Sequence, residues 1–393
     1  MFSEGQSPID FEHRYVGQNY TDEHHAWRKT IRDFLKAEVE PYIEEWEEAG
    51  EFPRDLYQKA AGIGLLGMGF PEEFGGTPVD GHLFSMVTSE EMARLGAGGL
   101  GASLLIHSIG LPPILAIGSD ELKQRIAPDV LAGEKVIALG ITEPSGGSDV
   151  ANIHTSAALV DDHYVVNGSK MFITGGMRAD YVSTAVRTGG EKHGGISLLL
   201  IPADAEGFTR TSLKKQGWNC SDTAALYFDN VRVPKENLIG GEGRGFEGIM
   251  YNFNGERIGM VTNCVAHSRV CFEDALSWAR HRETFGKRLA DHQVIRHKFS
   301  EMARHINVTQ AYLDQCLTRV DAGESPVADL ALLKVQATRT MEYCAREASQ
   351  IMGGASYMKG ERVERIYREV RVNAIGGGSE EIMLDLAARQ MRI

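Results

Sequence analysis

Segments of four kinds combine glycine, hydroxyl, aromatic and charged residues in patterns suited to binding a ligand. ITEPSGGSDVAN at 141–152 ends a predicted strand in a loop whose exposed amides could bind a phosphate or a carbonyl oxygen. KMFITGG at 170–176 puts Phe172 and Thr174 on one face of a predicted strand, where they could contact a flat heterocycle. Simpler interpretations stay open, because the first segment could be an ordinary turn and the phenylalanine a core residue.

The other two kinds interrupt helical sequence. RETFGKRLADHQ at 282–293 surrounds a predicted helix break at Gly286, and it could equally be a basic surface turn. Glycine-rich breaks occur in QIMGGASY at 350–357 and AIGGGSEEIM at 374–383. Such breaks mark either close approach to a ligand or another backbone, or plain helix ends.

Composition excludes several classes of function. The 393 residues suggest two or three domains, and the net charge of −13 with no basic run argues against nucleic-acid binding. There is no P-loop, no HExxH motif and no histidine spacing typical of a metal site, so no metal is expected. The five cysteines form no CxxC pair, which predicts buried, reduced thiols and a reducing compartment.

Two segments bear on targeting and membranes. The first fifteen residues lack both the basic and the apolar regions of a secretory signal. Residues 96–118 carry no formal charge and are long enough to cross a bilayer, but six glycines and the Pro112-Pro113 pair break their helical continuity. We expect buried helices joined by a turn, and no membrane span.

The periodicity changes twice along the chain. From Thr21 to Gly133 it is helical, with Thr21 and Ser119 as predicted N-caps and Gly133 as a helix end. Residues 135–241 contain short β runs, with turns predicted at Asp161-Asp162 and Asn167-Gly168. Helical periodicity returns from about Phe246, with enough segments for a bundle. The first helix should bury Trp27, Ile31, Phe34 and Leu35 on one face.

From about Thr21 onward the chain resembles the acyl-CoA dehydrogenase family. TEPSGGSDV, KMFITGG, RETFGKR and GGGSEEIM recur in the family's order and approximate spacing. The resemblance implies an α+β multidomain fold: an N-terminal α-helical domain at 1–134, a middle β-barrel or sandwich domain at 135–245, and a C-terminal α-helical bundle at 246–393. It also implies FAD as cofactor, an acyl-CoA substrate and a homo-oligomer, usually a tetramer that is a dimer of dimers.

The resemblance assigns roles to individual residues. Thr142 would contact the flavin, Ser148 would reach the CoA, and Phe172 stands where many members have tryptophan. Residues 282–293 and 350–354 would reach a neighbouring subunit's FAD. The implied cofactor-binding residues are Leu139, Ile141, Thr142, Gly147, Ser148, Phe172, Thr174, Arg282, Phe285, Gln293, Gln350, Gly353, Gly354, Ser379 and Glu381. The implied substrate-binding residues are Ser148, Phe246, Arg257, Gly377 and Gly378.

The catalytic base departs from the commonest family pattern. Many members carry it in a Tyr-Glu-Gly-Thr tetrapeptide, where this chain has Gly376–Ser379. A branch that includes long-chain and isovaleryl-type enzymes supplies glutamate from the helix that opens the last domain, and NGERIGM places Glu256 there. The resemblance thus implies that Glu256 abstracts the α-proton, that the Gly377 N–H polarises the thioester carbonyl, and that flavin N5 accepts the β-hydride. Without the resemblance, Glu256 would be an ordinary acid near a helix N-terminus.

The resemblance also implies a class of substrate and an electron acceptor, and we also expect a particular cellular compartment. Small residues at Gly96, Gly98, Gly99 and Gly101, with Leu105 where medium-chain relatives carry an acid, imply a roomy apolar pocket for medium-to-long or methyl-branched acyl chains. An electron-transferring flavoprotein would accept the electrons, in the cytoplasm or, for a processed chain, the mitochondrial matrix. The alternatives are an oxygen-using flavin oxidase or N-hydroxylase without CoA, and a catalytically inactive binding protein.

Overall fold

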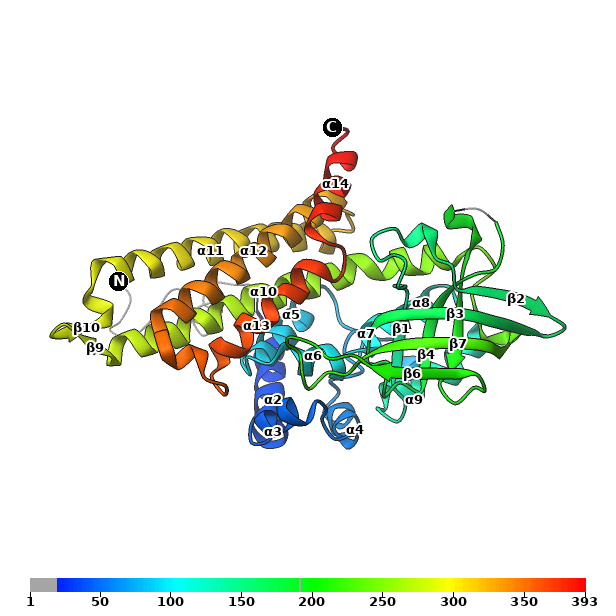
Figure 1. Cartoon of the computed structure of the whole chain (residues 1–393), viewed down its shortest axis with the longest axis horizontal. Helices are drawn as coiled ribbons and strands as arrows, with labels where there is room; N and C mark the ends of the chain where they lie inside the picture. The colour runs from blue at the N-terminus through cyan, green and yellow to red at the C-terminus, as the bar shows by residue number, and fades with distance from the viewer. Residues whose placement is uncertain (1–19, 191) are drawn as a thin grey trace. The chain divides into compact units, whose positions relative to one another are not determined.

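The computed structural model describes residues 20–190 and 192–393 (Figure 1). The first fifteen residues, for which we expect no secretory signal, lie outside this part of the chain. The described chain divides into two compact units, each built from segments distant in sequence. The helical unit comprises residues up to 44, 81–98 and 257–393, and the sheet unit comprises 45–80 and 99–256.

Long helices form the helical unit, and their apolar faces make its core. Thr21 caps the first helix as predicted, with the His24 ring as its side-chain partner at 2.9 Å, and the four expected apolar residues are buried. Figure 1 shows α10, α11 and α12 as the long helices of the bundle. The helices are α2 (Asp22–Glu38), α5 (Leu83–Ala93), α10 (Gly245–His281, shared with the sheet unit), α11 (Gln293–Asp321), α12 (Val327–Met352), α13 (Arg362–Ile375) and α14 (Glu380–Gln390).

Short helices precede a single sheet in the sheet unit. The helices are α3 (Ile43–Ala49), which begins two residues before the unit does, α4 (Asp55–Gly62), α6 (Gly98–Leu104), α7 (His107–Gly110), α8 (Pro112–Ile117) and α9 (Asp120–Leu131). The strands are β1 (Ile137–Gly140), β2 (Ser156–Val160), β3 (His163–Thr174), β4 (Tyr181–Arg187), β5 (Ile196–Pro202), β6 (Phe208–Ser212), β7 (Thr223–Pro234) and β8 (Leu238–Ile239). Ser119 caps α9 by accepting the Leu122 N–H, and Gly133 follows the helix with a positive φ of 73°.

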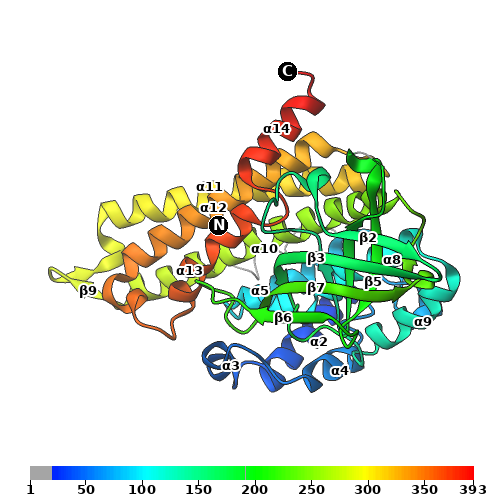
Figure 2. The ribbon, with the colours of Figure 1, turned by 45° about the vertical axis from the view of Figure 1, so that its right-hand side comes forward.

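Hydrogen bonds join the strands in the order β6-β7-β3-β2-β4-β5-β8, and β1 pairs in parallel with β4. Figure 2 shows β2, β3, β7 and β6 side by side in this sheet. The helix–sheet–helix fold class is therefore confirmed, as are the short β runs predicted within residues 135–241. The domain boundaries at 134/135 and 245/246 stay a prediction.

The turn predicted at Asn167-Gly168 is wrong. β3 runs through this dipeptide, and its register against β7 shifts between Val166 and Gly168. Gly168 therefore occupies a β-bulge, which a flexible residue in a strand also signals. The turn at Asp161-Asp162 is confirmed, since it joins β2 and β3 with Asp161 at a φ of 56°.

No single helix among the described residues is long and apolar enough to cross a membrane. Within residues 20–190 and 192–393, only α6 taken together with residues 107–117 has enough length and apolar character, and the two parts are bent by 51°. All five cysteines are buried and unpaired, as expected. In residues 20–190 and 192–393 no cluster of histidine, cysteine and acidic side chains could hold a metal ion.

Candidate functional site

In the sheet unit, the segment that follows β1 brings together the first group of predicted site residues. Leu139 ends up half-buried in β1, Ile141 is buried, and Thr142 is half-buried. Gly147 and Ser148 are exposed, with Gly147 beside the Thr142 methyl group. The loop between them is pinched by a bridge between Glu143 and Gly146. The predicted loop is thus present, with exposed residues at 147 and 148.

A buried ion pair fixes this segment to β3. The Lys170 ammonium donates to a Glu143 carboxylate oxygen at 2.8 Å and to the Ile141 carbonyl at 3.0 Å. Glu143 also accepts the backbone N–H groups of His154 at 2.6 Å and Thr155 at 2.9 Å. The Lys170 side chain is completely buried and that of Glu143 nearly so. The pair was not predicted from the sequence, although both residues lie inside the two quoted motifs.

The charges of the pair follow from its surroundings. Burial alone would raise the pKa of Glu143, but the Lys170 charge and three hydrogen bonds outweigh it and hold that pKa below its usual value. Burial lowers the pKa of Lys170 to about 8, against the opposing charge of Glu143. At neutral pH both groups are therefore ionised.

Phe172 lies beside this pair on an exposed part of β3. Its φ is 63°, and the register of β3 against β7 shifts between Lys170 and Ile173. The Phe172 ring is 67% exposed, whereas Ile173 is buried, and Thr174 is half-buried. A bulge thus turns Phe172 outward, and the core interpretation of this aromatic residue is wrong.

In the helical unit, the glycine run before α14 is held by a second buried lysine. Gly377 and Gly378 have φ values of 63° and 104°, a backbone shape that disfavours side chains. Lys334 of α12 is fully buried and donates to the Gly378 carbonyl at 2.6 Å. Ser379 caps α14 by accepting the Ile382 N–H, and Glu381 is exposed in the first turn. The glycine run is therefore a loop that Lys334 holds in place and that leads into the N-terminus of α14.

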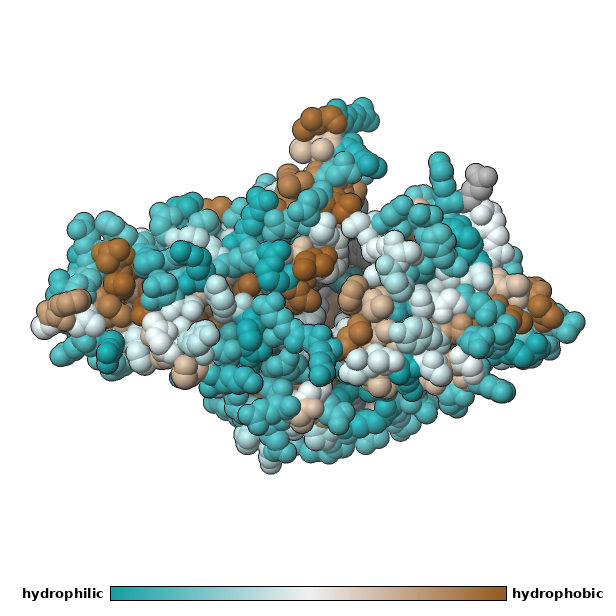
Figure 3. Space-filling model, in the orientation of Figure 1, coloured by the Kyte–Doolittle hydropathy of each residue, from teal (hydrophilic) through white to brown (hydrophobic). Residues whose placement is uncertain are grey.

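The predicted helix break at Gly286 is a β-hairpin. Two short strands, β9 (Glu283–Thr284) and β10 (Lys287–Arg288), pair across Phe285 and Gly286, which both have positive φ. Phe285 is 97% exposed at the hairpin tip. Apolar surface is visible at the end of the bundle where the hairpin lies (Figure 3).

The arginines of this hairpin differ in their partners. Arg288 forms an ion pair with Asp291 at 3.0 Å. Arg282 is exposed, and within the described part of the chain its guanidinium forms no ion pair. Gln293 begins α11 and is exposed. Arg282 is therefore available to an anion from outside the chain.

The second glycine break follows α12. Gln350 is exposed in the last turn of α12, and Gly353 and Gly354 begin a short 3-10 helix at 353–357. A Cβ atom at either glycine would meet no atom within 4 Å. This backbone is open to close approach, which agrees with a ligand contact and does not identify one.

Glu256 lies well inside a helix. α10 begins at Gly245, so Glu256 is about three turns from the N-terminus. The interpretation of Glu256 as an acid at a helix N-terminus is wrong, because the dipole effect is confined to the first turn. Glu256 is half-buried and Arg257 is buried, and the two compact units meet in sequence between these residues. Phe246 is half-buried in the first turn, with its ring centroid 4.0 Å from that of His193.

Two of the glycines expected to leave space for an acyl chain are packed against protein atoms. In the helical unit, a Cβ at Gly96 would lie 2.7 Å from the Arg362 side chain, and the Gly98 N–H donates to Glu369 at 2.9 Å. In the sheet unit, a Cβ at Gly99 would lie 2.8 Å from the Trp218 backbone. The expected space for an acyl chain is therefore absent beside Gly96 and Gly99, because close packing uses it.

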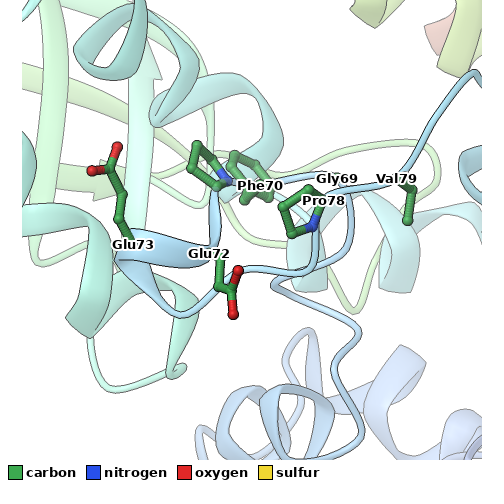
Figure 4. Close-up of a pocket in the computed structure, with 7 residues that line it drawn as sticks. Gly69, Phe70, Glu72, Glu73, Pro78 and Val79 are labelled. Carbon is green, nitrogen blue, oxygen red and sulfur yellow. The ribbon is translucent and has the colours of Figure 1, made fainter.

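A surface pocket of about 430 Å³ lies elsewhere in the sheet unit (Figure 4). Residues from 69–73 and 78–79 line it, including the side chains of Phe70, Glu72 and Pro78. None of the predicted site residues lines this pocket.

Comparison with known proteins gives a consistent result. Family models described as acyl-CoA dehydrogenase N-terminal, middle and C-terminal domains match residues 21–134, 138–231 and 243–392. The long-chain specific acyl-CoA dehydrogenase of Rattus norvegicus mitochondria is 36% identical, over 95% of this chain and 87% of that protein.

Two solved structures extend the similarity. A probable acyl-CoA dehydrogenase from Mycobacterium abscessus is 46% identical, with a TM-score of 0.92, over 94% of this chain and 99% of that one. A chain in a structure described as an electron transferring flavoprotein of Acidaminococcus fermentans is 30% identical, with a TM-score of 0.90, over 96% of this chain and 99% of that one.

The buried ion pair predicts a pH dependence of stability. Since the folded-state pKa of Glu143 is depressed, its contribution is complete above the unfolded value of about 4.3 and is lost as pH falls through the folded value. Glu143→Gln leaves the Lys170 charge buried alone, which should cost about 3–5 kcal/mol of unfolding free energy at pH 7. The difference between wild type and variant, measured by urea unfolding, should stay constant from pH 7 to about pH 5 and shrink as the pH falls further, through the depressed pKa of Glu143. A pH-independent difference would contradict the charged state of Glu143.

Proposed function

The chain belongs to the acyl-CoA dehydrogenase family of FAD-dependent oxidoreductases, and we propose that Glu256 is the base that removes the α-proton of its acyl-CoA substrate. The observation that carries this proposal is that Glu380 and Glu381, the two acids beside the glycine run, already accept hydrogen bonds. Glu380 accepts hydrogen bonds from Arg339 and from Thr338, each at 3.0 Å. Hydrogen bonds from its own backbone N–H and the Ser379 hydroxyl lower the pKa of Glu381. Both are therefore weak candidates for a base, whereas Glu256 is half-buried on a long helix.

In this proposal Glu256, Gly377 and Lys334 have different roles in the reaction. A carboxylate in a dry site becomes more basic, because burial disfavours its charged form, and Glu256 gains its strength in this way when substrate excludes water. The Gly377 N–H donates a hydrogen bond to the thioester carbonyl as negative charge develops there. Lys334 keeps the next residue's carbonyl in place, so that this N–H is fixed in advance. FAD, when bound, supplies the acceptor for the β-hydride at its N5 atom.

Features of both units fit FAD. In the sheet unit, Thr142, Phe172 and Thr174 present hydroxyl groups and an exposed ring, which suit a flat heterocycle with polar edges. In the helical unit, an unpaired arginine, an exposed aromatic ring and open glycine backbone suit a pyrophosphate and an adenosine. We assign the first group to the flavin ring and the second, with Gln293 and Gln350, to the FAD of a neighbouring subunit. Leu139, Ile141, Gly147, Ser148, Ser379 and Glu381 complete the cofactor-binding set.

A homo-oligomer follows from this assignment. An almost fully exposed phenylalanine at a hairpin tip costs free energy in water, which contact with a second copy and its FAD would recover. We propose a tetramer, the usual state of the family.

The electron acceptor and the compartment are proposed on similarity. An electron-transferring flavoprotein is the proposed acceptor, supported by the resemblance to a chain of the Acidaminococcus fermentans structure. The cytoplasm is the proposed compartment, supported by the mycobacterial relative, while the rat relative is mitochondrial.

Glu256→Gln tests the catalytic proposal. The substitution keeps the volume of the side chain but removes the proton acceptor, so turnover should fall by about 10²–10⁴ with FAD content unchanged. Anaerobic bleaching of the flavin by acyl-CoA measures the step directly. Glu247→Gln, on the same helix but exposed and paired with Arg244, is the matched control, and Glu380→Gln tests the other acid. Bleaching of the Glu256→Gln enzyme at the wild-type rate would refute the assignment.

Arg282→Ala tests the cofactor site of the helical unit. A charge-assisted contact with pyrophosphate is worth roughly 1.5–3 kcal/mol, so the Kd for FAD should rise by about 10- to 100-fold. Arg288→Ala is the control, because this neighbouring arginine is already paired with Asp291. Equal FAD affinities for the two variants, measured by titrating FAD-depleted enzyme, would contradict the placement.

A panel of acyl-CoA thioesters tests the proposed preference for medium-to-long or methyl-branched chains. Support for this preference comes from the long-chain specific relative, since Gly96 and Gly99 do not provide the space. Each buried methylene adds about 0.8 kcal/mol, so kcat/KM should rise with chain length until the pocket is full. Dye-reduction assays give the profile, and a maximum at butyryl-CoA would exclude the proposal.

A further inference from the structure

The buried ion pair between Lys170 and Glu143 connects β3 to the segment after β1, although these two segments do not pair as strands. β1 ends at Gly140, and its ladder is with β4. Residues 141, 142 and 143 follow β1, and each of them is hydrogen-bonded to Lys170 or Met171 of β3. Lys170 binds the Ile141 carbonyl and the Glu143 carboxylate, and the Met171 N–H donates to the Thr142 carbonyl at 2.8 Å. Thr142 is thus fixed from both sides.

The same two residues of β3 lead directly into Phe172. The bulge at Lys170/Ile173 leaves Met171 and Phe172 without regular pairing to β7, and the Phe172 backbone has a positive φ. Burial of Lys170 on one side and Ile173 on the other holds the ends of the bulge. The direction of the exposed Phe172 ring therefore depends on the anchoring of Lys170.

We propose that Lys170 and Glu143 are positioning residues that lock Thr142 and Phe172 into one rigid seat for the flavin ring. The proposal rests on the assignment of Thr142 and Phe172 to the flavin. Neither charged group contacts the cofactor in this account. Their effect passes through the backbone of 141–143 and through the bulge, so that both contacting side chains are in place before FAD binds.

The chemistry of the pair explains why charged residues occupy this position. The Ile141 carbonyl and the N–H groups of His154 and Thr155 would lose their partners if apolar side chains replaced the pair. A lysine ammonium has several donors on one atom, and a carboxylate has several acceptor sites. One ion pair can therefore make four hydrogen bonds that join three segments of the chain.

The rival explanation is a purely structural ion pair, and a double variant separates the two. Lys170→Met and Glu143→Gln each leave one buried charge alone, so each should lower the melting temperature of the holoenzyme. The double variant Lys170→Met/Glu143→Gln leaves no buried charge, while glutamine can still accept an N–H group. Its melting temperature should recover toward wild type. The Ile141 carbonyl, however, still lacks its lysine donor.

The expected result is a separation of stability from FAD binding. FAD dissociation from the double variant should remain faster by about 10- to 100-fold, the cost typical of losing supporting contacts around a site. Its flavin visible circular dichroism should also differ from wild type. Recovery of both melting temperature and FAD dissociation would overturn the proposal, because the pair would then be structural alone.

A more conservative variant tests the proposal even if the Lys170 and Glu143 variants above do not fold. Glu143→Asp keeps the buried charge but shortens the reach by one methylene, so it cannot hold Lys170 and both N–H groups at once. FAD dissociation should accelerate severalfold, and an unchanged rate would also overturn the proposal. Arg28→Met breaks another buried ion pair, with Glu91 at 3.5 Å in the helical unit, and should lower the melting temperature without changing the FAD rate.

Thr142→Val and Phe172→Ala distinguish failure of this inference from failure of the proposed function. If these variants leave FAD dissociation and the flavin spectrum unchanged, the flavin does not bind at this seat and the underlying assignment fails. If they change both while the Lys170 and Glu143 variants do not, only the positioning role is wrong.

Discussion

A lysine charge is stable inside a protein only where oxygen atoms replace the water that it loses, and the sheet unit meets this condition at Lys170. A carboxylate and a carbonyl surround the ammonium, and two further N–H groups satisfy the carboxylate. Because those oxygens belong to residues 141 and 143, satisfying the charge also fixes the loop after β1. The exposed Phe172 on β3 depends on the same anchor.

In the helical unit, a buried lysine also holds a loop, the glycine run before α14. Lys334 is buried on α12 and reaches the Gly378 carbonyl, in a loop whose positive φ values only glycine adopts readily. A lysine can fix such a loop through its backbone without requiring a side chain there. Nearby Cys264 is no part of the chemistry, since burial raises the pKa of its thiol to about 12. The loop is thus both free of bulky side chains and held in place, as a backbone donor to a substrate carbonyl requires.

The departure at Gly377 has a structural consequence for the choice of base. In this chain a carboxylate at that position would have to adopt a φ of 63°, which strains a side-chain-bearing residue. The neighbouring acids are bound to Arg339, Thr338 and the N-terminus of α14. Glu256, the acid that we propose as the base, lies instead on the long helix α10, which is a rigid support for it.

The sequence by itself determined the order of helical, sheet and helical regions, the caps at Thr21 and Ser119, and the motifs that identify the family. These features depend on residues within a few positions of each other, which periodicity and capping chemistry describe well. Tertiary structure alone decided the bulges around Gly168 and Phe172, because a bulge is defined by the partner strand β7. It also decided the hairpin at 283–288, whose two-residue strands are too short to show alternation, and the filling of space at Gly99 by Trp218. Burial of Lys170 belongs to the same class, since lysine is normally exposed and only its contact with Glu143, 27 positions earlier in the chain, makes burial stable.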